Sequence, residues 1–386
     1  MLRKHIYKAI SPALLAGIAI TTTSCEEAEN EADVPSLHEA FEGLFLIGGT
    51  LSDRMILDTS DPGYAIAEKH FNSLSPENCM KWGRMNPEPN VENYELAETF
   101  VRYGAANDQA LVGHTLFWHS QTPDWVYKDE AGNDLSREAL LARMRERATL
   151  MAERWGDEIV YWDVVNESIM GDGSWRKSKY QQIIGDDFTE QAFRIASEIL
   201  PPNAQLLYND YSMTDAGRRD AVVAMVKDFK AKGLRIDGIG MQGHWLMDFP
   251  DTKDIAESIQ AFGSTGVKVH ITELDLDLLG RASFFGADVD IRAIQVTPEN
   301  NPYPDGVAPP AEEERFANRY GEIFETLVAN ADHIERVTFW GITDKTSWLN
   351  HFPVRGRTNF ALLFDRQYQP KPAFYRVLET AKNRKE

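Results

Sequence analysis

Two glutamates, Glu167 and Glu273, each follow a short apolar run of the kind that forms a buried β-strand. A pair of carboxyl groups can do acid–base and nucleophilic work when one is protonated and the other is ionised. Asp275 should share a strand face with Glu273, and His244 from a neighbouring run could bond to both and keep Glu273 charged. The run before Glu167 contains Trp162 and two valines, so apolar surroundings are expected to favour the protonated form of this glutamate.

Other apolar runs also end in polar or aromatic side chains, which a fold selected only for stability has no reason to keep. Carboxylates could do chemistry, amides and histidines could bind hydroxyl groups, and aromatic rings could stack on sugar faces. Glycoside hydrolysis needs two carboxyl groups flanking the scissile bond, and a separation of about 5 to 5.5 Å would give retention of configuration. These side chains are Glu77, Asn78, Lys81, Trp82, His114, Trp118, His119, Asn166, Asp210, Tyr211, Gln242 and Trp340.

The elements that must position these residues follow a repeating order. Eight apolar runs alternate with longer amphipathic stretches, which predicts βα units and a parallel sheet. Eight units indicate a single-domain α/β fold, the (β/α)8 TIM barrel, in which catalytic groups lie at the carboxyl ends of the strands. The expected strands are residues 44–51, 71–76, 111–117, 159–165, 205–209, 238–243, 267–272 and 336–341. The expected helices include residues 136–155, 187–200, 215–232 and 311–329, and the long connection at 279–310 is expected to be a rim loop.

The N-terminus is expected to direct export. Basic residues precede an apolar run at 13–20, which is shorter than the roughly 20 residues of a membrane-spanning helix. The small residues before Cys25 and the acidic stretch after it resemble the lipobox of bacterial lipoproteins, although Thr22 stands where an aliphatic residue is usual. We therefore expect a lipidated Cys25 on a periplasmic or cell-surface lipoprotein, the alternative being cleavage near Ser24 and secretion. The expected organisation is a signal peptide at 1–24, an acidic tether at 25–36 and the barrel domain at 37–386.

Composition restricts the partners. The net charge is −20 and no dense run of Lys and Arg occurs, which argues against nucleic acid or an anionic membrane surface. Membrane contact is expected only through a lipid on Cys25, and the chain is expected to be a monomer. Cys79 is the only other cysteine, and it is expected to be a buried small hydrophobe instead of a nucleophile.

Seven motifs, in order along the chain, resemble those of glycoside hydrolase family 10. Two surround the carboxylates, WDVVNE at 162–167 and ITELD at 271–275. The resemblance covers about residues 37–378 and implies a (β/α)8 barrel without metal or cofactor. It also implies endo-hydrolysis of β-1,4-xylan and xylo-oligosaccharides with retention. The other motifs are ENCMKW at 77–82, HTLFWHSQTPDW at 114–125, YNDY at 208–211, GMQGH at 240–244, and FWG at 339–341 followed by Asp344, Ser347 and Trp348.

The resemblance also implies roles for individual residues. Glu167 would be the acid/base and Glu273 the nucleophile, with His244 and Asp275 tuning the nucleophile. Asn166 would bond the 2-hydroxyl of the sugar at the cleavage point, an interaction expected to strengthen in the transition state. The remaining contacts would be Lys81, His114 and Gln242 to other hydroxyls of that sugar, Glu77, Asn78 and Gln121 to the next sugar towards the non-reducing end, and aromatic walls of Trp118, Tyr211, Trp340 and Trp348. Ser168 departs from the family pattern, where Ala is common.

Three alternatives stay open at this point. Another retaining glycosidase of the same barrel type, such as an endo-glucanase or mannanase, would share both glutamates but not the motif at 77–82 or the closely spaced His114 and His119. A non-catalytic glycan-binding lipoprotein should have lost one of the carboxylates. A metal hydrolase built on these two histidines with His244 and Asp275 lacks compact ligand spacing, because residues five apart on an extended strand face opposite sides.

Overall fold

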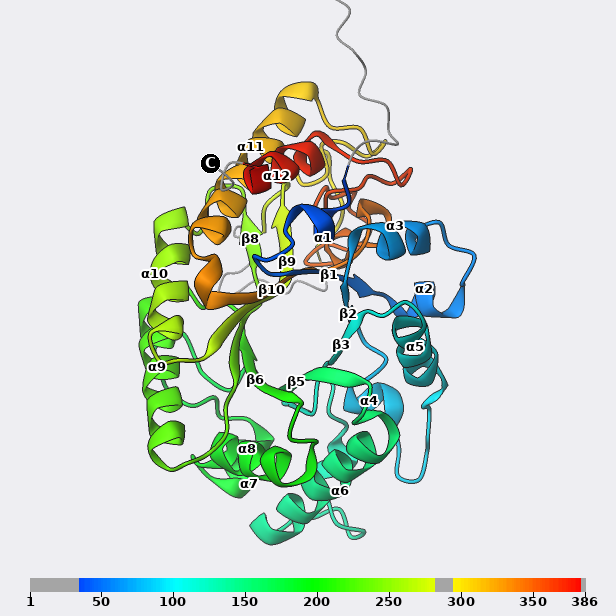
Figure 1. The fold of residues 1–386 in the computed structure, drawn as a ribbon. Coiled ribbons are helices and arrows are strands. Elements are labelled where there is room, and N and C mark those ends of the chain that lie inside the picture. Colours follow the sequence, from blue (N-terminus) through cyan, green and yellow to red (C-terminus); the bar gives the residue numbers. More distant parts are fainter. Residues whose placement is uncertain (1–34, 282–293, 383–386) are drawn as a thin grey trace, which may run out of the picture. The chain divides into compact units, whose positions relative to one another are not determined.

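Eight parallel strands close into a barrel in this computed structural model, which describes residues 35–281 and 294–382. The ring closes because β10 pairs with both β1 and β9, and the strands surround the barrel axis in Figure 1. The predicted (β/α)8 barrel is therefore confirmed. In ring order the strands are β1 (Leu46–Leu51), β2 (Ser73–Pro76), β3 (Ala110–Gly113), β5 (Ile159–Asn166), β6 (Gln205–Asp210), β7 (Gly238–Met241), β9 (Lys268–Asp277) and β10 (Ile334–Phe339).

All eight expected strands are present. Six of them differ from the expected limits by one or two residues at an end, and two differ by more. The third strand ends at Gly113, and two residues later the Thr115 hydroxyl donates to the Asp163 carbonyl at 2.6 Å. A short strand β4 (Phe117–Trp118) follows it and pairs with β5. β9 runs on to Asp277 because an unpredicted strand, β8 (His244–Leu246), pairs with its last residues. Glu273 therefore lies within β9, not after its end.

Helices form the shell around the barrel (Figure 1). The four predicted helices agree with the observed ones to within one residue at each end. Among these, α6 begins where the Ser136 hydroxyl accepts a hydrogen bond from the backbone N–H of Ala139. Such a bond is the usual way to satisfy a free amide at the start of a helix. The helices are α1 (Leu37–Ala40), α2 (Asp53–Leu57), α3 (Gly63–His70), α4 (Trp82–Met85), α5 (Glu95–Ala106), α6 (Arg137–Trp155), α7 (Lys179–Ile184), α8 (Phe188–Ile199), α9 (Ala216–Ala231), α10 (Thr252–Gly263), α11 (Pro310–Ala329) and α12 (Pro372–Lys382), with 3-10 turns η2 (Asp124–Tyr127), η5 (Ala331–His333), η6 (Asp344–Thr346) and η7 (Trp348–Asn350).

The core has two layers, one between strands and helices and one inside the barrel. In the outer layer, Phe339 of β10 stacks on Phe324 of α11 with ring centroids 5.9 Å apart. Inside the barrel, a glycine lets a large or polar side chain lie close to the neighbouring strand. A Cβ at position 240 would lie 2.3 Å from the Asn209 amide oxygen, so glycine at this point of β7 makes room for an amide that reaches the catalytic region.

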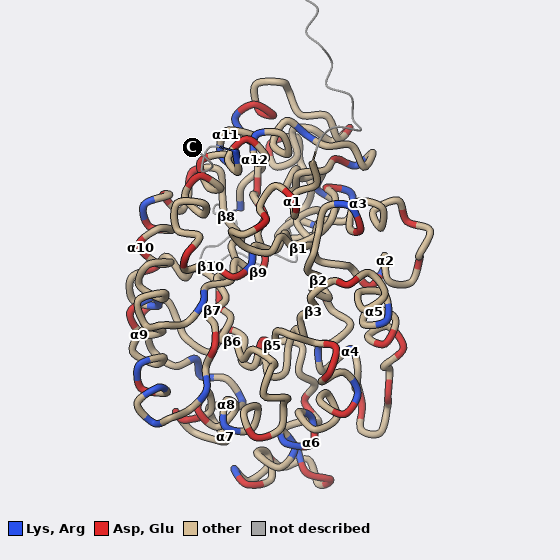
Figure 2. Tube along the Cα trace, viewed as in Figure 1, with Lys and Arg blue, Asp and Glu red and all other residues tan. Residues whose placement is uncertain are grey.

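Charges of both signs are mixed along the shell helices (Figure 2). Within the residues that the structure describes, no helix is long and apolar enough to cross a membrane. Cys25, the expected signal peptide and residues 282–293 of the expected rim loop lie outside these residues. Cys79 is 1% exposed, and burial raises the pKa of its thiol. The expectation of a buried, unreactive cysteine agrees with this placement.

Candidate active site

The carboxyl ends of the strands open into a cleft of about 770 Å³. Twelve of the fifteen residues predicted for the site line it. The other three, His114, Asn166 and Asp275, are buried and do not line the cleft. Their hydrogen-bond partners are described below. The lining consists of Glu77, Asn78, Lys81, Trp118, Gln121, Glu167, Tyr211, Ser212, Thr214, Gln242, His244, Trp245, Phe249, Glu273, Arg281, Trp340, Trp348 and Phe352.

Glu273 is buried in the wall of this cleft, 5% exposed. One carboxylate oxygen faces His244 Nε2 at 3.0 Å, and the other accepts from Asn209 Nδ2 at 2.8 Å. Burial alone would raise the pKa of Glu273. The bonds from His244 and Asn209 and the nearby charges of His114 and His244 outweigh burial, so the pKa lies below its ordinary value. The structure thus favours the ionised carboxylate.

His244 is held between two carboxylates. Its Nδ1 lies 3.0 Å from Asp275, on the side opposite Glu273. Burial would lower the pKa of His244, but the charge of Asp275 and the bonds to both carboxylates raise it to about 9. Trp348 Nε1 donates to the same Asp275 oxygen at 2.7 Å. The predicted tuning pair is therefore assembled, with an imidazolium that faces Glu273 at neutral pH.

Glu167 stands in a different setting. It follows β5 with a φ of 61°, a left-handed backbone that non-glycine residues rarely adopt and that gathers at functional sites. Gln121 and Ser212, which also line the cleft, have φ of 53° and 45°. The Glu167 carboxylate accepts from Trp118 Nε1 at 3.0 Å and from Gln242 Nε2 at 2.9 Å. The sequence neighbours of Glu167 predicted apolar surroundings, but its carboxylate oxygens contact polar N–H donors.

The backbone beyond Glu167 is fixed from below. Tyr208 on β6 accepts from the amides of Ser168 and Ile169 at 3.2 and 3.0 Å and donates to the buried Asp210. Arg176 Nε donates to the Glu167 carbonyl at 2.7 Å. The family departure at Ser168 is accommodated locally, where its hydroxyl lies 3.0 Å from that of Thr189.

A chain of amides joins the two glutamates. Asn209 Nδ2 bonds both Glu273 and the Asn166 amide oxygen, the latter at 2.9 Å. Gln242 Nε2 bonds Glu167 and lies 3.4 Å from the same Asn166 oxygen. Asn166 Nδ2, the remaining donor of that amide, lies 3.5 Å from Glu167. These bonds fix the rotamers of the amides between the carboxylates.

Two further pairs lie at the floor of the cleft. His114 Nδ1 lies 2.8 Å from Asp163 on β5, and both side chains are buried. Lys81 donates to the Asn78 amide oxygen at 3.0 Å, and Asn78 donates to Glu77 at 3.1 Å. Burial lowers the pKa of Lys81, opposed by the charges of Glu273, Glu77 and Glu167. Burial raises the pKa of Glu77, opposed by Lys81.

Aromatic rings form the walls. The Lys81 ammonium lies 4.9 Å from the Trp118 ring centre and 6.0 Å from that of Trp340. Trp348 stacks on Phe352 with centroids 5.0 Å apart. Tyr211 is held through its hydroxyl, which accepts from Arg176 at 2.7 Å. Rings held in this way offer fixed apolar faces to a sugar.

Sequence reasoning missed several residues of the site. Asn209 is the last residue of the run expected at 205–209 and Asp163 lies inside β5, and the strand-end criterion selected neither of them. Their signal was a polar residue within an otherwise apolar run. Ser212, Thr214, Phe249, Arg281 and Phe352 lie on connections whose path no local pattern fixes, and Trp245 lies on the unpredicted strand β8.

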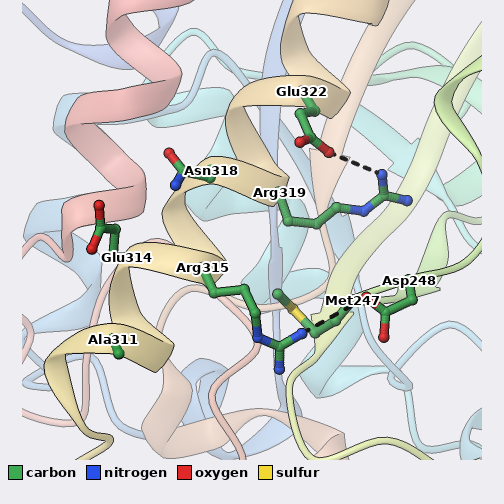
Figure 3. A pocket seen from close by; sticks show the side chains of 8 residues that line it. All are labelled: Met247, Asp248, Ala311, Glu314, Arg315, Asn318, Arg319 and Glu322. Atoms are coloured by element: carbon green, nitrogen blue, oxygen red, sulfur yellow. Dashed lines mark hydrogen bonds and ion pairs between the residues drawn. The ribbon is translucent and has the colours of Figure 1, made fainter.

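A second hollow, of about 360 Å³, lies between α11 and the connection after β8 (Figure 3). Four of its charged side chains form pairs: Arg319 with Glu322 at 3.4 Å and Arg315 with Asp248 at 3.8 Å. No aromatic ring lines it; the lining is Met247, Asp248, Ala311, Glu314, Arg315, Asn318, Arg319 and Glu322. It therefore lacks both the stacking faces and the tuned carboxylates of the first cleft.

The metal-site alternative gains no support from side-chain positions. Within residues 35–281 and 294–382, no group of three or more His, Cys, Asp or Glu side chains is arranged to hold a metal ion. His119 does not line the cleft, and burial lowers its pKa to about 4. His114 and His244 are each bonded to a carboxylate.

Comparison with known proteins agrees with this geometry. Residues 36–380 match the model of glycosyl hydrolase family 10. The chain is 40% identical to endo-1,4-beta-xylanase A of Xylanibacter ruminicola over 89% of this chain and 93% of that protein. It is 39% identical to an endo-1,4-beta-xylanase of Geobacillus stearothermophilus, over 90% of this chain and 99% of that protein.

A solved structure of a GH10 endoxylanase from a sugarcane soil metagenome matches with a TM-score of 0.84 and 40% identity, covering 90% of this chain and all of that one. The family model and these relatives each cover nearly the whole barrel. The chain belongs to glycosyl hydrolase family 10.

Proposed function

We propose that this protein is a retaining endo-β-1,4-xylanase, with Glu273 as nucleophile and Glu167 as acid/base. One observation carries the assignment. Both carboxylates line one cleft, but Glu273 faces the His244 imidazolium, whereas Glu167 accepts from the neutral donors of Trp118, Gln242 and, at 3.5 Å, Asn166. A carboxylate held charged suits nucleophilic attack, and one free of a cationic partner suits proton transfer.

The reaction proceeds in two displacements. A Glu273 oxygen attacks the anomeric carbon while Glu167 gives its proton to the leaving glycosidic oxygen, so the carbon–oxygen bond to the leaving sugar breaks and a glycosyl ester forms. Glu167, now ionised, takes a proton from water, whose oxygen attacks the same carbon and releases Glu273. Two inversions at that carbon give net retention.

The neighbours of the two glutamates hold the sugar. Asn166 lies between them and has an amide N–H for the 2-hydroxyl at the cleavage point. We assign Lys81, His114 and Gln242 to the other hydroxyls of that sugar, where they would fix its orientation between the two glutamates. The next sugar towards the non-reducing end contacts Glu77, Asn78 and Gln121, and the rings of Trp118, Tyr211, Trp340 and Trp348 stack on sugar faces.

The substrate assignment rests on the family and the names of its members. The two relatives described above are called endo-1,4-beta-xylanases, and the cleft offers hydroxyl-binding groups and ring faces suited to a neutral glycan. A rival β-glycanase of the same barrel would use the same carboxylates, so only substrate preference separates the two.

Hydrolysis of glucuronoxylan by the purified chain, beside barley β-glucan, tests this function. We expect short xylo-oligosaccharides from the wild type and near-total loss in Glu273→Ala. Glu325→Ala is the matched control, because Glu325 pairs only with Arg376 on the outer helices, at 2.8 Å. Preference for β-glucan would contradict the substrate assignment. Failure to cleave either polymer would contradict the proposed hydrolase activity.

We further propose that the chain is exported and anchored by a lipid on Cys25, and that it acts as a monomer. The support is the order of basic, apolar and small residues before Cys25 and the acidic stretch after it. The wild-type chain should sediment with membranes and the Cys25→Ser chain should not. A soluble wild type would contradict anchoring, and a solution mass near twice 43.7 kDa would contradict the monomer.

A further inference from the structure

A buried positive charge lies inside the barrel, below the cleft and towards the amino-terminal ends of the strands. Arg336 of β10 is completely buried. Its guanidinium carbon lies 5.2 Å from the ring centre of Tyr161 on β5, which is not a neighbour of β10 in the sheet. The side chain therefore reaches across the barrel interior. None of the roles proposed above uses it.

The contacts of Arg336 do not balance its charge. Nη1 donates to the Thr338 hydroxyl at 2.6 Å and lies 3.4 Å from that of Ser75. Nε and Nη2 are buried and have no hydrogen-bond partner among the described residues, and none of the described carboxylates lies within ion-pair distance of the guanidinium. An unpaired buried cation is strongly destabilising, so a charge this deep calls for an opposite charge nearby.

Asp163 is the anion that fits. It is two residues beyond Tyr161 on β5, so it faces the same interior one step nearer the cleft. It is 2% exposed, and its Oδ1 is buried without a partner while Oδ2 bonds His114. Burial lowers the pKa of Arg336, and Asp163 is the largest influence opposing that effect.

The other titratable groups around Arg336 do not supply that anion. His270 of β9 is buried, and burial and the Arg336 charge hold its pKa far below its ordinary value, so it is neutral. Burial raises the pKa of Tyr161 to about 12, so it too is neutral. Glu335 lies 3.3 Å from the Tyr161 hydroxyl, at the far end of that ring. Asp163 remains, and it opposes the effect of burial on the Arg336 pKa more strongly than Glu335 or Glu273 does.

We propose that Arg336 is a positioning residue for the nucleophile: its guanidinium stands opposite the Asp163 carboxyl group inside the barrel, and Asp163 in turn holds the His114 ring, through His114 Nδ1, beside Glu273. The inference rests on the proposed hydrolase function, because Glu273 must be the nucleophile for the effect to appear in the kinetics. Arg336 touches no substrate.

The test measures the acidic limb of kcat/KM on an aryl β-xylobioside with a good leaving group. Such a substrate needs no proton from Glu167, so the limb reports ionisation of Glu273 in the free enzyme. In Arg336→Met we expect the limb to move up by about 0.5 to 1 pH unit, equivalent to a roughly 3- to 10-fold loss on the acid side. Arg336→Lys keeps the charge and should restore most of the limb.

Arg319→Met is the matched control. Arg319 is another buried arginine, on α11 outside the barrel, bonded to the Pro250 carbonyl and Glu322 (Figure 3). It should lose stability and keep the wild-type limb. A limb unchanged in Arg336→Met, or one moved equally by Arg319→Met, would overturn the proposal. An inactive wild type would instead count against the proposed function.

A double variant covers the case in which Arg336→Met does not fold. Asp163→Asn removes the opposing charge and keeps an oxygen that can accept from His114. If the two charges are coupled, Asp163→Asn with Arg336→Met should be more stable than Arg336→Met alone. A double variant no more stable than Arg336→Met would show that the two charges do not interact and would overturn the proposal.

Discussion

Replacing Asn209 by alanine should weaken the proposed nucleophile, Glu273, while leaving Glu273 itself in place. Asn209 is fully buried and donates to Glu273 at 2.8 Å and to Asn166 at 2.9 Å, while its oxygen accepts from Thr272 at 2.7 Å. A hydrogen bond to a charged group is worth about 1.5 to 3 kcal/mol. Since about 1.4 kcal/mol is a tenfold change, kcat/KM should fall roughly 10- to 150-fold.

The assay is steady-state cleavage of a xylo-oligosaccharide across a range of pH. Loss of the donor removes one of the groups that lower the pKa of Glu273, so the acidic limb should rise by about one pH unit or more. Thr272→Val is the matched control, because it removes a hydroxyl that bonds Asn209 but makes no bond to Glu273. Its kinetic loss should be about tenfold smaller, although both variants lose stability.

The reasoning fails if Asn209→Ala keeps kcat/KM within about threefold of the wild type with an unmoved limb. It also fails if Thr272→Val matches the full kinetic loss, because the effect would then come from packing. A fall in melting temperature alone does not distinguish the two explanations, because both variants lose buried hydrogen bonds.

Three other predictions concern the remaining groups of the site. Glu167→Gln should lower kcat/KM on xylan by about 10²- to 10⁴-fold, and much less on an aryl β-xylobioside whose leaving group needs no proton. His244 has a folded pKa of about 9, above the unfolded value near 6.5, so it stabilises the fold fully below pH 6.5 and loses that contribution as pH rises through 9. This difference in pKa corresponds to on the order of 3 kcal/mol of stability, so the melting temperature should fall between pH 6.5 and 9. Asp275→Asn should make that fall less steep. An equally steep fall in this variant would contradict the role of Asp275 in raising the pKa of His244. Trp348→Phe keeps the stack on Phe352 but loses the 2.7 Å bond to Asp275, so activity should fall about tenfold, and a variant equal to the wild type would show that this bond has no role in tuning.

The sequence was informative wherever a pattern repeats. Period and length of the apolar runs predicted eight strands, and the position after a strand predicted Glu167, because parallel barrels present their strand ends at one mouth. The rule worked less well for Glu273. It lies inside β9, which continues to Asp277 through pairing with β8, and a three-residue strand such as β8 has no periodicity to detect.

Polar residues inside the barrel could not be assigned a role from sequence. Asn209, Asp163 and Arg336 sit within apolar runs, and their partners come from strands that are distant in the chain. Local patterns report which face of a strand is buried, not what lies opposite across the interior. The seven motifs resembling family 10 located the site because they contain residues that come together only in the folded barrel.

The depth of each glutamate explains its role better than its sequence neighbours do. Glu167 stands at the end of β5 on a left-handed backbone, at the mouth, where neutral donors of Trp118 and Gln242 hold it. Glu273 lies within β9, where burial would neutralise it unless a cation were buried with it. His244 supplies that cation, and Asp275 keeps His244 charged in turn. A charge introduced for catalysis thus requires a chain of opposite charges leading inward, and the unpaired guanidinium of Arg336 lies where such a chain, through Asp163 and His114, would end.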